Sequence, residues 1–179
     1  MTTAAADFDM TFDTAVGKLQ LRSEVHGSLI ELLQGGPLTL RELVERLPQP
    51  APSWSSITDV LKMLIARGDL QPALPADGDA ERAISVRTFN DAVLARAADN
   101  AEFGYLASAV TGGGVRVDRL TQLYLIAKAR SIDDPTDALT KLVAAAEPQS
   151  AGDARERVGK EIRRIETSVV PTLRRIGVL

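Results

Sequence analysis

The sequence predicts a mainly α protein, in which an N-terminal winged-helix-like domain precedes a helical domain with a small β-hairpin. Three observations favour this class. Hydrophobic residues make up 45% of the 179 residues and aromatic residues only 4%, so the core must be built from Leu, Val, Ile and Ala, of which Leu and Ala favour helices. Apolar residues recur at helical spacing through most of the chain. Short apolar runs beside glycine and proline turns predict a few strands.

The first part of the chain begins with a leader, a strand and a helix. Residues 1–14 are expected to be a flexible acidic leader, and their alternating aromatic spacing keeps a strand open as the alternative. A short strand is expected at 16–21, because its two leucines share one face. A helix follows, which Ser23 is expected to cap and which the glycines and proline at 35–37 end.

Two further helices and a strand complete this region. Thr39 and Glu42 form a capping-box pattern, so a second helix is expected to begin there. A third helix is expected from about Ser56, and residues 70–74 are expected to leave it as a strand. The order strand, helix, helix, helix, strand over residues 15–75 therefore predicts a winged-helix-like domain. A three-helix bundle is the alternative that gives nearly the same pattern.

The remainder, residues 82–179, predicts a helical domain that follows a polar linker at 76–81. Apolar runs on either side of the glycines at 112–114 predict a small hairpin. The expected helix starts combine capping residues with acidic first turns, and they lie at Thr88, Asp118, Asp134 and about Asp153. Pro171 is expected to interrupt the last helix.

The residue types argue against a catalytic centre. The chain has no cysteine and one histidine, so it offers neither thiolate chemistry nor the four nitrogen or sulfur ligands of a structural zinc site. His26 is expected to face solvent or to cap a helix. No Gly-x-Ser-x-Gly motif is present, and the acids at 77–81 lack an ordered calcium loop. We therefore expect no enzymatic activity, no metal and no cofactor.

The three consecutive glycines at 112–114 are the best candidate for a phosphate-binding loop. A P-loop requires a downstream Gly-Lys-Ser/Thr, and a dinucleotide fingerprint requires glycines that open a helix. The residues that follow here, 115–117, are Val-Arg-Val, which predict a strand. A hairpin turn that uses positive φ angles is therefore the expectation.

Nucleic-acid binding is the alternative function, as a winged-helix transcriptional regulator whose third helix reads DNA. The net charge of −3 does not draw the chain onto a polyanion. The third helix offers only Lys62 and Arg67 as cations, and no basic wing follows it. A basic cluster near the C terminus, which includes Arg163 and Arg164, is interleaved with acids and is typical of a solvated helix face. Nucleic-acid binding is thus disfavoured.

Binding of another protein is the leading expectation. A lone large aromatic residue in a proline-rich connection is typical of an interface anchor, although Trp54 and Tyr105 could equally fill gaps in the local core. The candidate interface residues are Trp54, the hairpin residues Tyr105, Thr111, Gly112 and Gly114, and the basic residues Arg163 and Arg164. The sequence leaves the oligomeric state open, with a homo-oligomer as one option.

The expected compartment is the cytoplasm. The opening residues have neither the positive start nor the apolar run of a signal peptide. No segment is apolar over the roughly 20 residues that a membrane span requires, so no membrane association is expected.

Several short motifs together resemble the bacterial methyltransferase regulatory domain. Residues 106–115, Leu-Ala-Ser-Ala-Val-Thr-Gly-Gly-Gly-Val, are similar to its Leu-Ala-Ser-Pro-Val-x-Gly-x-Gly block, and Ala109 stands where that family usually has proline. Residues 89–94 resemble its Leu-Asn helix start, and residues 171–178 resemble its Pro-x-Leu-x-x-Leu-Gly ending. The Gly-Pro-Leu-Thr-Leu-Arg-Glu-Leu stretch at 36–43 is also similar in layout.

That domain is the C-terminal, non-catalytic portion of protein lysine methyltransferase-like proteins. Their activity belongs to a Rossmann-type domain, which holds S-adenosylmethionine through a glycine-rich turn, and nothing in this sequence matches that turn. The resemblance therefore implies an accessory module, either a separately encoded companion of a methyltransferase or a fragment of one. Its implied partner is a methyltransferase catalytic chain or the protein substrate of that chain. The combined expectation is a non-catalytic regulatory or substrate-recruiting module.

Overall fold

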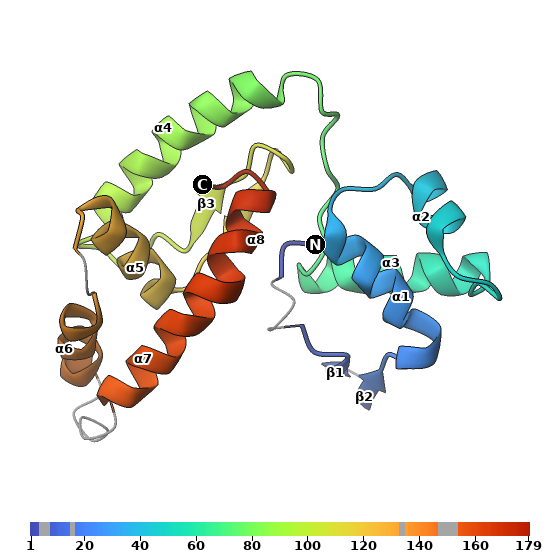
Figure 1. Cartoon of the computed structure of the whole chain (residues 1–179), viewed down its shortest axis with the longest axis horizontal. Coiled ribbons are helices and arrows are strands. Elements are labelled where there is room, and N and C mark those ends of the chain that lie inside the picture. Colours follow the sequence, from blue (N-terminus) through green and yellow to red (C-terminus); the bar gives the residue numbers. More distant parts are fainter. Residues whose placement is uncertain (4–7, 15–16, 133–134, 147–153) are drawn as a thin grey trace. The chain divides into compact units, whose positions relative to one another are not determined.

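The computed structural model describes residues 1–3, 8–14, 17–132, 135–146 and 154–179. The chain divides into two compact units, Met1–Ala73 and Leu74–Leu179. Each unit is mainly helical and carries one antiparallel two-stranded sheet, β1–β2 in the first and β3–β4 in the second (Figure 1). The predicted class, mainly α with a small hairpin, is confirmed.

The first unit consists of a short hairpin followed by three helices that share one core. Its elements are β1 (Thr11–Thr14), β2 (Gly17–Gln20), α1 (Ser23–Gly35), α2 (Leu40–Arg46) and α3 (Trp54–Arg67). One apolar side of each helix faces a common core, which contains Leu29, Ile30, Leu33, Leu43, Leu47, Ile57, Val60, Leu61 and Leu64. The helices begin and end where local chemistry dictates. Thr39 and Glu42 form the predicted capping box, and Gly68 ends α3 in the left-handed conformation.

The leader differs from the expectation of a flexible segment. The amino group of Met1 donates a hydrogen bond to the carbonyl oxygen of Leu33 at 3.0 Å, and the Met1 side chain is only 8% exposed. Farther along, residues 11–14 pair with residues 17–20 as the first hairpin. The open alternative, a strand within the leader, is what forms. The strand predicted at 16–21 is present as β2, although residue 16 lies outside the described residues.

The strand predicted at 70–74 is absent, and with it the wing of a winged helix. These residues run as an irregular segment with no ladder. Pro72 has no amide hydrogen to donate, and the amide of Leu74 instead donates to the carbonyl oxygen of Val110 at 2.8 Å. The only hairpin that the structure describes in this unit precedes α1. Moreover, Ser23 is the first residue of α1 rather than its cap, since Arg22 holds the N-cap position without a side-chain bond.

The second unit surrounds its hairpin with helices. Its elements are α4 (Asp79–Ala97), β3 (Tyr105–Ala107), β4 (Gly114–Arg116), α5 (Arg119–Ala129), α6 (Thr136–Ala146), α7 (Ala154–Arg164), a π-helical turn (Ile165–Val169) and α8 (Val170–Arg175). Figure 1 shows β3 between α4 on one side and α8 on the other. Leu106, Val115 and Val117 from the hairpin region pack with Ile162, Ile165 and Leu173 in one core.

Helix α4 begins earlier than predicted. It starts at Asp79, inside the expected linker 76–81, and Thr88 lies within it with its hydroxyl bonded to the carbonyl oxygen of Ile84 at 3.1 Å. Two acids in the first turn, Asp79 and Glu81, stabilise this start against the positive end of the helix dipole. By contrast, Asp118 caps α5 as predicted, accepting from the amide of Thr121 at 2.9 Å.

Pro171 does not break the final helix. Because proline has no amide hydrogen, the backbone widens into a π-helical turn at 165–169, and α8 continues beyond it. The predicted starts at Asp134 and Asp153 lie outside the described residues. Among the described helices, none is long and apolar enough to cross a membrane.

Candidate functional site

Asn90 fixes the position of α4 against the hairpin. Its side-chain amide donates to the carbonyl oxygens of Ala107 and Val178, each at 2.9 Å, and its oxygen accepts from the amide of Ala107 at 2.7 Å. Asn90 is only 3% exposed. It thus bonds both backbone groups of Ala107 on the edge of β3, which a neighbouring strand would otherwise satisfy.

The hairpin presents one buried face and one open face. Leu106 and Val115 pair directly and point into the core, so their neighbours along each strand point outwards. Tyr105 lies on this open face and is 61% exposed. Its ring packs over Gly114, where an added Cβ would lie 3.5 Å from Tyr105 Cδ1.

The turn between the strands is tightly built. Gly112 has a φ of +68°, and a Cβ there would lie 2.6 Å from Leu74 Cδ1. The amide of Thr111 donates to Ser108 Oγ at 3.0 Å. Furthermore, Ser108 Oγ donates to the carbonyl oxygen of Ile176, which ties the turn to α8. The predicted use of positive φ in this turn is confirmed at Gly112.

A groove runs between α4 and the open side of the hairpin; we call it the α4–hairpin groove. Its volume of ≈ 670 Å³ is within the range of small-ligand and peptide sites. The α4 wall consists of Glu81, Arg82, Ser85, Val86 and Phe89, and the opposite wall consists of residues 105–109 and 112–114. The predicted interface residues Tyr105, Gly112 and Gly114 therefore lie together in one site, with Thr111 in the adjoining turn.

Phe89 is a groove residue that sequence reasoning missed. A helix that starts at Thr88 would place Phe89 in its first turn, whereas Phe89 lies in the middle of α4 and is 56% exposed. The error follows from the helix boundary. With α4 beginning at Asp79, Phe89 continues a row that Ser85 and Val86 begin, because positions four and three residues apart share a helix face.

Of the two charged side chains that line the groove, one is paired and the other is not. Arg82 is held within its own unit, because its guanidinium donates to the carbonyl oxygens of Pro75, Asp77 and Ala109 at 2.6, 2.7 and 3.0 Å and also pairs with Asp79. Glu81 is exposed and has no partner among the described residues. The groove therefore presents one unneutralised negative charge.

The other candidate interface residues do not line this groove. Trp54 is 58% exposed in the first turn of α3, in the first unit, rather than in an extended connection. On α7, Arg164 is held by Glu161 through Nε at 2.8 Å, while Arg163 is exposed. None of these three residues is therefore part of the groove lining.

The cations of α3 are both neutralised within the first unit. Lys62 Nζ lies 3.3 Å from Asp59, and Arg67 Nε lies 2.7 Å from Asp69. A helix that reads DNA needs cations free to contact phosphates. Nothing in this geometry favours the DNA-binding alternative.

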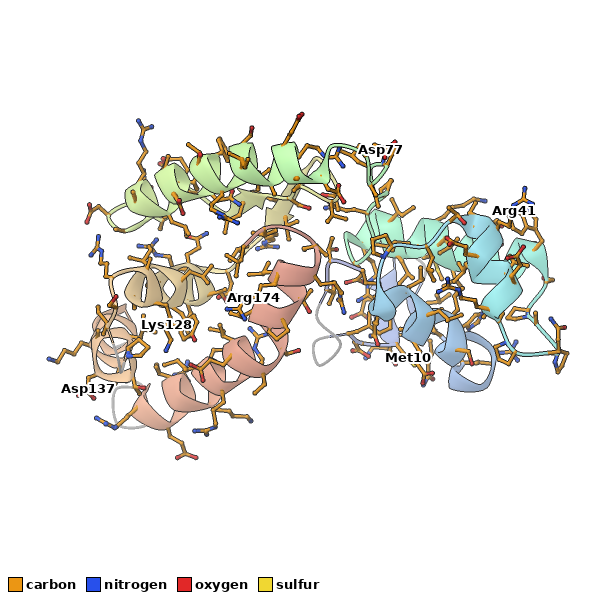
Figure 2. The ribbon with its side chains drawn as sticks, turned by 45° about the horizontal axis from the view of Figure 1, so that its top comes forward. Met10, Arg41, Asp77, Lys128, Asp137 and Arg174 are labelled. Carbon is orange, nitrogen blue, oxygen red and sulfur yellow. The ribbon has the colours of Figure 1, made fainter. Side chains whose placement is uncertain are left out.

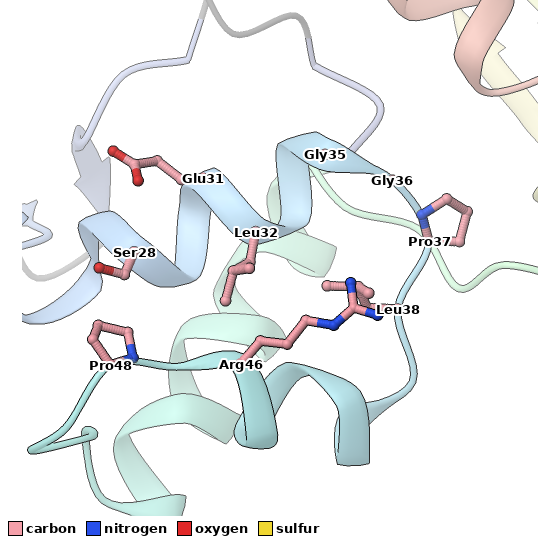
Figure 3. A pocket seen from close by; sticks show the side chains of 9 residues that line it. All are labelled: Ser28, Glu31, Leu32, Gly35, Gly36, Pro37, Leu38, Arg46 and Pro48. Carbon is pink, nitrogen blue, oxygen red and sulfur yellow. The ribbon is translucent and has the colours of Figure 1, made fainter.

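A second hollow lies in the first unit, between α1 and the end of α2. It is lined by Ser28, Glu31, Leu32, Gly35, Gly36, Pro37, Leu38, Arg46 and Pro48. Figure 3 shows Arg46 extending across it towards Leu38, with Glu31 directed away. Arg46 Nη2 is also 3.8 Å from Glu42. This hollow lacks exposed aromatic side chains and converging polar groups, so it is a weaker candidate than the α4–hairpin groove.

His26 is buried, contrary to the expectation that it faces solvent or caps a helix. It lies between α1 and α3, with Nε2 3.3 Å from Ser56 Oγ. Burial lowers the pKa of His26 below its ordinary value, and the positive charge of Arg22 adds to this effect. Nδ1 has no hydrogen-bond partner, so no acid orients the ring as a catalytic base would require.

Tyr124 forms the other notable polar contact of the second unit. Its hydroxyl donates to Glu166 Oε1 at 2.8 Å, and Lys128 lies 3.8 Å from the same carboxylate. Burial, and then the bond to Glu166, raise the pKa of Tyr124 to about 12. Figure 2 shows Lys128 on α5 and Arg174 on α8 in this unit. A phenol with so high a pKa stays protonated near neutrality, so it ties α5 to the π-helical turn and is a poor general base.

No group of three or more potential metal ligands occurs in the part of the chain that the structure describes.

The comparisons with known proteins add one relative. An uncharacterized Synechocystis protein, sll1526, is 33% identical over 120 residues, which cover 67% of this chain and 24% of that protein. This chain therefore matches about a quarter of the relative's length. No family model and no solved structure matches the chain.

Proposed function

We propose that this chain is a non-catalytic protein-binding module, associated with a methyltransferase, that captures its partner in the α4–hairpin groove. One observation carries the proposal. Two large aromatic side chains, Phe89 and Tyr105, are each more than half exposed on the walls of one groove. Aromatic residues of this kind, placed in a hollow, are typical anchors of protein interfaces.

The exposed area is large enough to matter energetically. An aromatic side chain buries about 200 Å² when fully covered, so covering the remaining half of each ring removes roughly 100 Å² from water. At about 25 cal/mol per Å², each ring then contributes roughly 2.5 kcal/mol of apolar burial. Loss of motional freedom offsets part of this gain on association. The two rings together supply roughly 5 kcal/mol, so they anchor a partner only in combination with further contacts along the groove.

The association with a methyltransferase rests on the sequence resemblance. The block that carries it, residues 106–115, forms β3, the glycine turn and the start of β4, and most of these residues line the groove. The Synechocystis relative carries its similar segment within a much longer chain, which suits a module that works beside other domains. The partner would be a methyltransferase catalytic chain or that enzyme's protein substrate.

Photo-crosslinking in the cells that naturally make this protein tests this function. A benzoylphenylalanine residue placed at Phe89 should form adducts with a protein that contains a methyltransferase domain, or with its substrate. The same residue placed at Ile84, which is exposed on α4 but outside the groove, is the matched control. Mass spectrometry of the adducts identifies the partner.

Two results would refute the proposal. One is an adduct pattern at position 89 that equals the pattern at position 84. The other is calorimetric binding of S-adenosylmethionine by the chain alone, because a module without a catalytic domain should release no heat with this cofactor.

A further inference from the structure

We infer that the α4–hairpin groove selects an extended peptide segment in which a basic side chain lies three or four residues from a large apolar one. The inference rests on the proposed function and specifies its ligand. Three features of the groove carry it: its single free charge, the distance along α4 from that charge to Phe89, and the backbone groups that β3 leaves unpaired at Tyr105.

The first feature is charge complementarity. Glu81 and Arg82 are the charged residues among the groove's lining side chains. Arg82 is occupied by three carbonyl oxygens and by Asp79, whereas Glu81 has no partner among the residues described. A ligand that places a lysine or arginine beside Glu81 pairs with this carboxylate, and a ligand that places an acid there is repelled.

The second feature is spacing. Glu81 and Phe89 are eight residues apart on α4, and a helix rises 1.5 Å per residue, so they are separated by about 12 Å along its axis. An extended chain rises about 3.3 Å per residue. The two contacts therefore fit side chains three or four positions apart in an extended ligand, one apolar residue at Phe89 and one basic residue at Glu81.

The third feature is the backbone of β3. Gly104 pairs with Val117 and Ser108 pairs with Gly113 through ladder bonds of 2.9 and 3.0 Å. In an antiparallel ladder such bonded pairs alternate with unbonded ones, so the backbone groups of Tyr105 point outwards on the same side as those of Ala107.

Asn90 already bonds the groups of Ala107 on that side. The amide and carbonyl of Tyr105 therefore face the side of α4 and have no hydrogen-bond partner among the described residues. An extended peptide can bond both of them, and this is the way that peptides add to a free strand edge.

Selection from a random dodecapeptide phage library, with the intact chain as bait, tests the inference. Enriched sequences should carry lysine or arginine three or four positions from Phe, Leu, Ile, Met or Trp. The most enriched peptide, labelled with fluorescein, should lose affinity about tenfold with Phe89→Ala. It should lose affinity about two- to fivefold with Glu81→Gln at low salt.

Matched controls lie on the same helix. Ile84→Ala removes an exposed apolar side chain and Asp91→Asn removes an exposed acid, both outside the groove, and neither should change affinity. Glu81→Lys should shift the selected sequences from basic to acidic residues. Unaltered circular dichroism of each variant establishes that it is folded.

The outcomes separate this inference from the proposed function. If enrichment depends on Phe89 but shows no basic preference and no response at position 81, the ligand class is wrong while the groove remains a binding site. If no sequence is enriched over the Phe89→Ala variant, the inference fails. Specific crosslinking at position 89 would then still support binding of a partner that contacts the groove with something other than an extended peptide.

Discussion

Replacing Asn90 by alanine should destabilise the second unit specifically. The change removes three hydrogen bonds at once and leaves the amide of Ala107 and the carbonyls of Ala107 and Val178 without partners. Each bond contributes about 1 kcal/mol net, and a buried group left unpaired costs somewhat more. The expected loss in the free energy of unfolding is therefore about 3 kcal/mol, which for a unit of this size lowers Tm by roughly 10–15 °C.

The distribution of aromatic residues lets each unit be observed separately. Trp54 is the single tryptophan and belongs to the first unit, whereas both tyrosines, Tyr105 and Tyr124, belong to the second. Urea unfolding followed by near-UV dichroism of the tyrosines should shift to lower denaturant in Asn90→Ala. Tryptophan fluorescence, excited at wavelengths that tyrosine does not absorb, should report an unchanged first transition.

Two companion variants sharpen the test. Asn90→Asp keeps an acceptor for the amide of Ala107 but places carboxylate oxygens against two carbonyl oxygens, so it should destabilise more than alanine at neutral pH and recover partly in acid. Asn100→Ala, in the loop after α4, should cost less than about 1 kcal/mol, because the two contacts that it loses, both with Glu102, are exposed to solvent. A loss below about 1 kcal/mol in Asn90→Ala would show that Asn90 does not hold α4 to the hairpin.

Three further outcomes follow from the contacts described. The pKa of His26 is lowered on folding, so as pH falls through about 6.5 the unfolded chain binds this proton more readily than the folded chain. The free energy of unfolding, measured by urea titration, should therefore fall as pH drops below about 6.5. It should fall less in His26→Gln. Gly112→Ala should lower the Tm of the second unit, because it forces a side chain into positive φ against Leu74, whereas an unchanged Tm would contradict the described turn. In a spectrophotometric titration of the folded chain, Tyr124→Phe should lose an ionisation step at about pH 12, and Glu166→Gln should move that step to lower pH; a lost step near pH 10 would contradict the described burial.

Features encoded by neighbouring residues were predicted from the sequence. The capping box of Thr39 and Glu42 and the cap at Asp118 depend on bonds across three residues. The hairpin at 105–116 follows from its glycines and the apolar runs beside them. In each case the amino acid types at fixed short spacing determine the local backbone, so the pattern is visible without any knowledge of packing.

Features decided by distant contacts were not predictable in this way. The leader is held by a bond from Met1 to Leu33, and an acidic composition gives no sign of it. His26 is buried because α3 brings Ser56 against α1. The early start of α4 was also not predicted, because the turn residues before it resemble a linker. The hydrogen bond from Arg82 to the carbonyl oxygen of Ala109, which is distant in the sequence, gives no signal there.

Only the hairpin wall of the groove was therefore predicted from the sequence. Tyr105 and the glycines were identified because the hairpin itself was predicted. Phe89 and Glu81 were not, because their alignment along one helix depends on where that helix begins. The candidate site became apparent once the α4 wall and the hairpin wall were placed on either side of the same hollow.

The π-helical turn at 165–169 has a consequence for the geometry of the last helix. A π-helical turn holds more residues than an α-helical turn, so the residues beyond it lie at a different angle about the axis than they would in an unbroken α-helix. Before the turn, Val158 and Ile162 face the core on a helix that packs against α6. After it, Leu173 and Ile176 must reach the core beside the hairpin turn, where the carbonyl of Gly177 accepts from the amide of Ala109. One continuous rod thereby packs against α6 at one end and beside the hairpin turn at the other. Deleting a single residue from the wide turn would restore a regular α-helix and leave both of these contacts nearly in place.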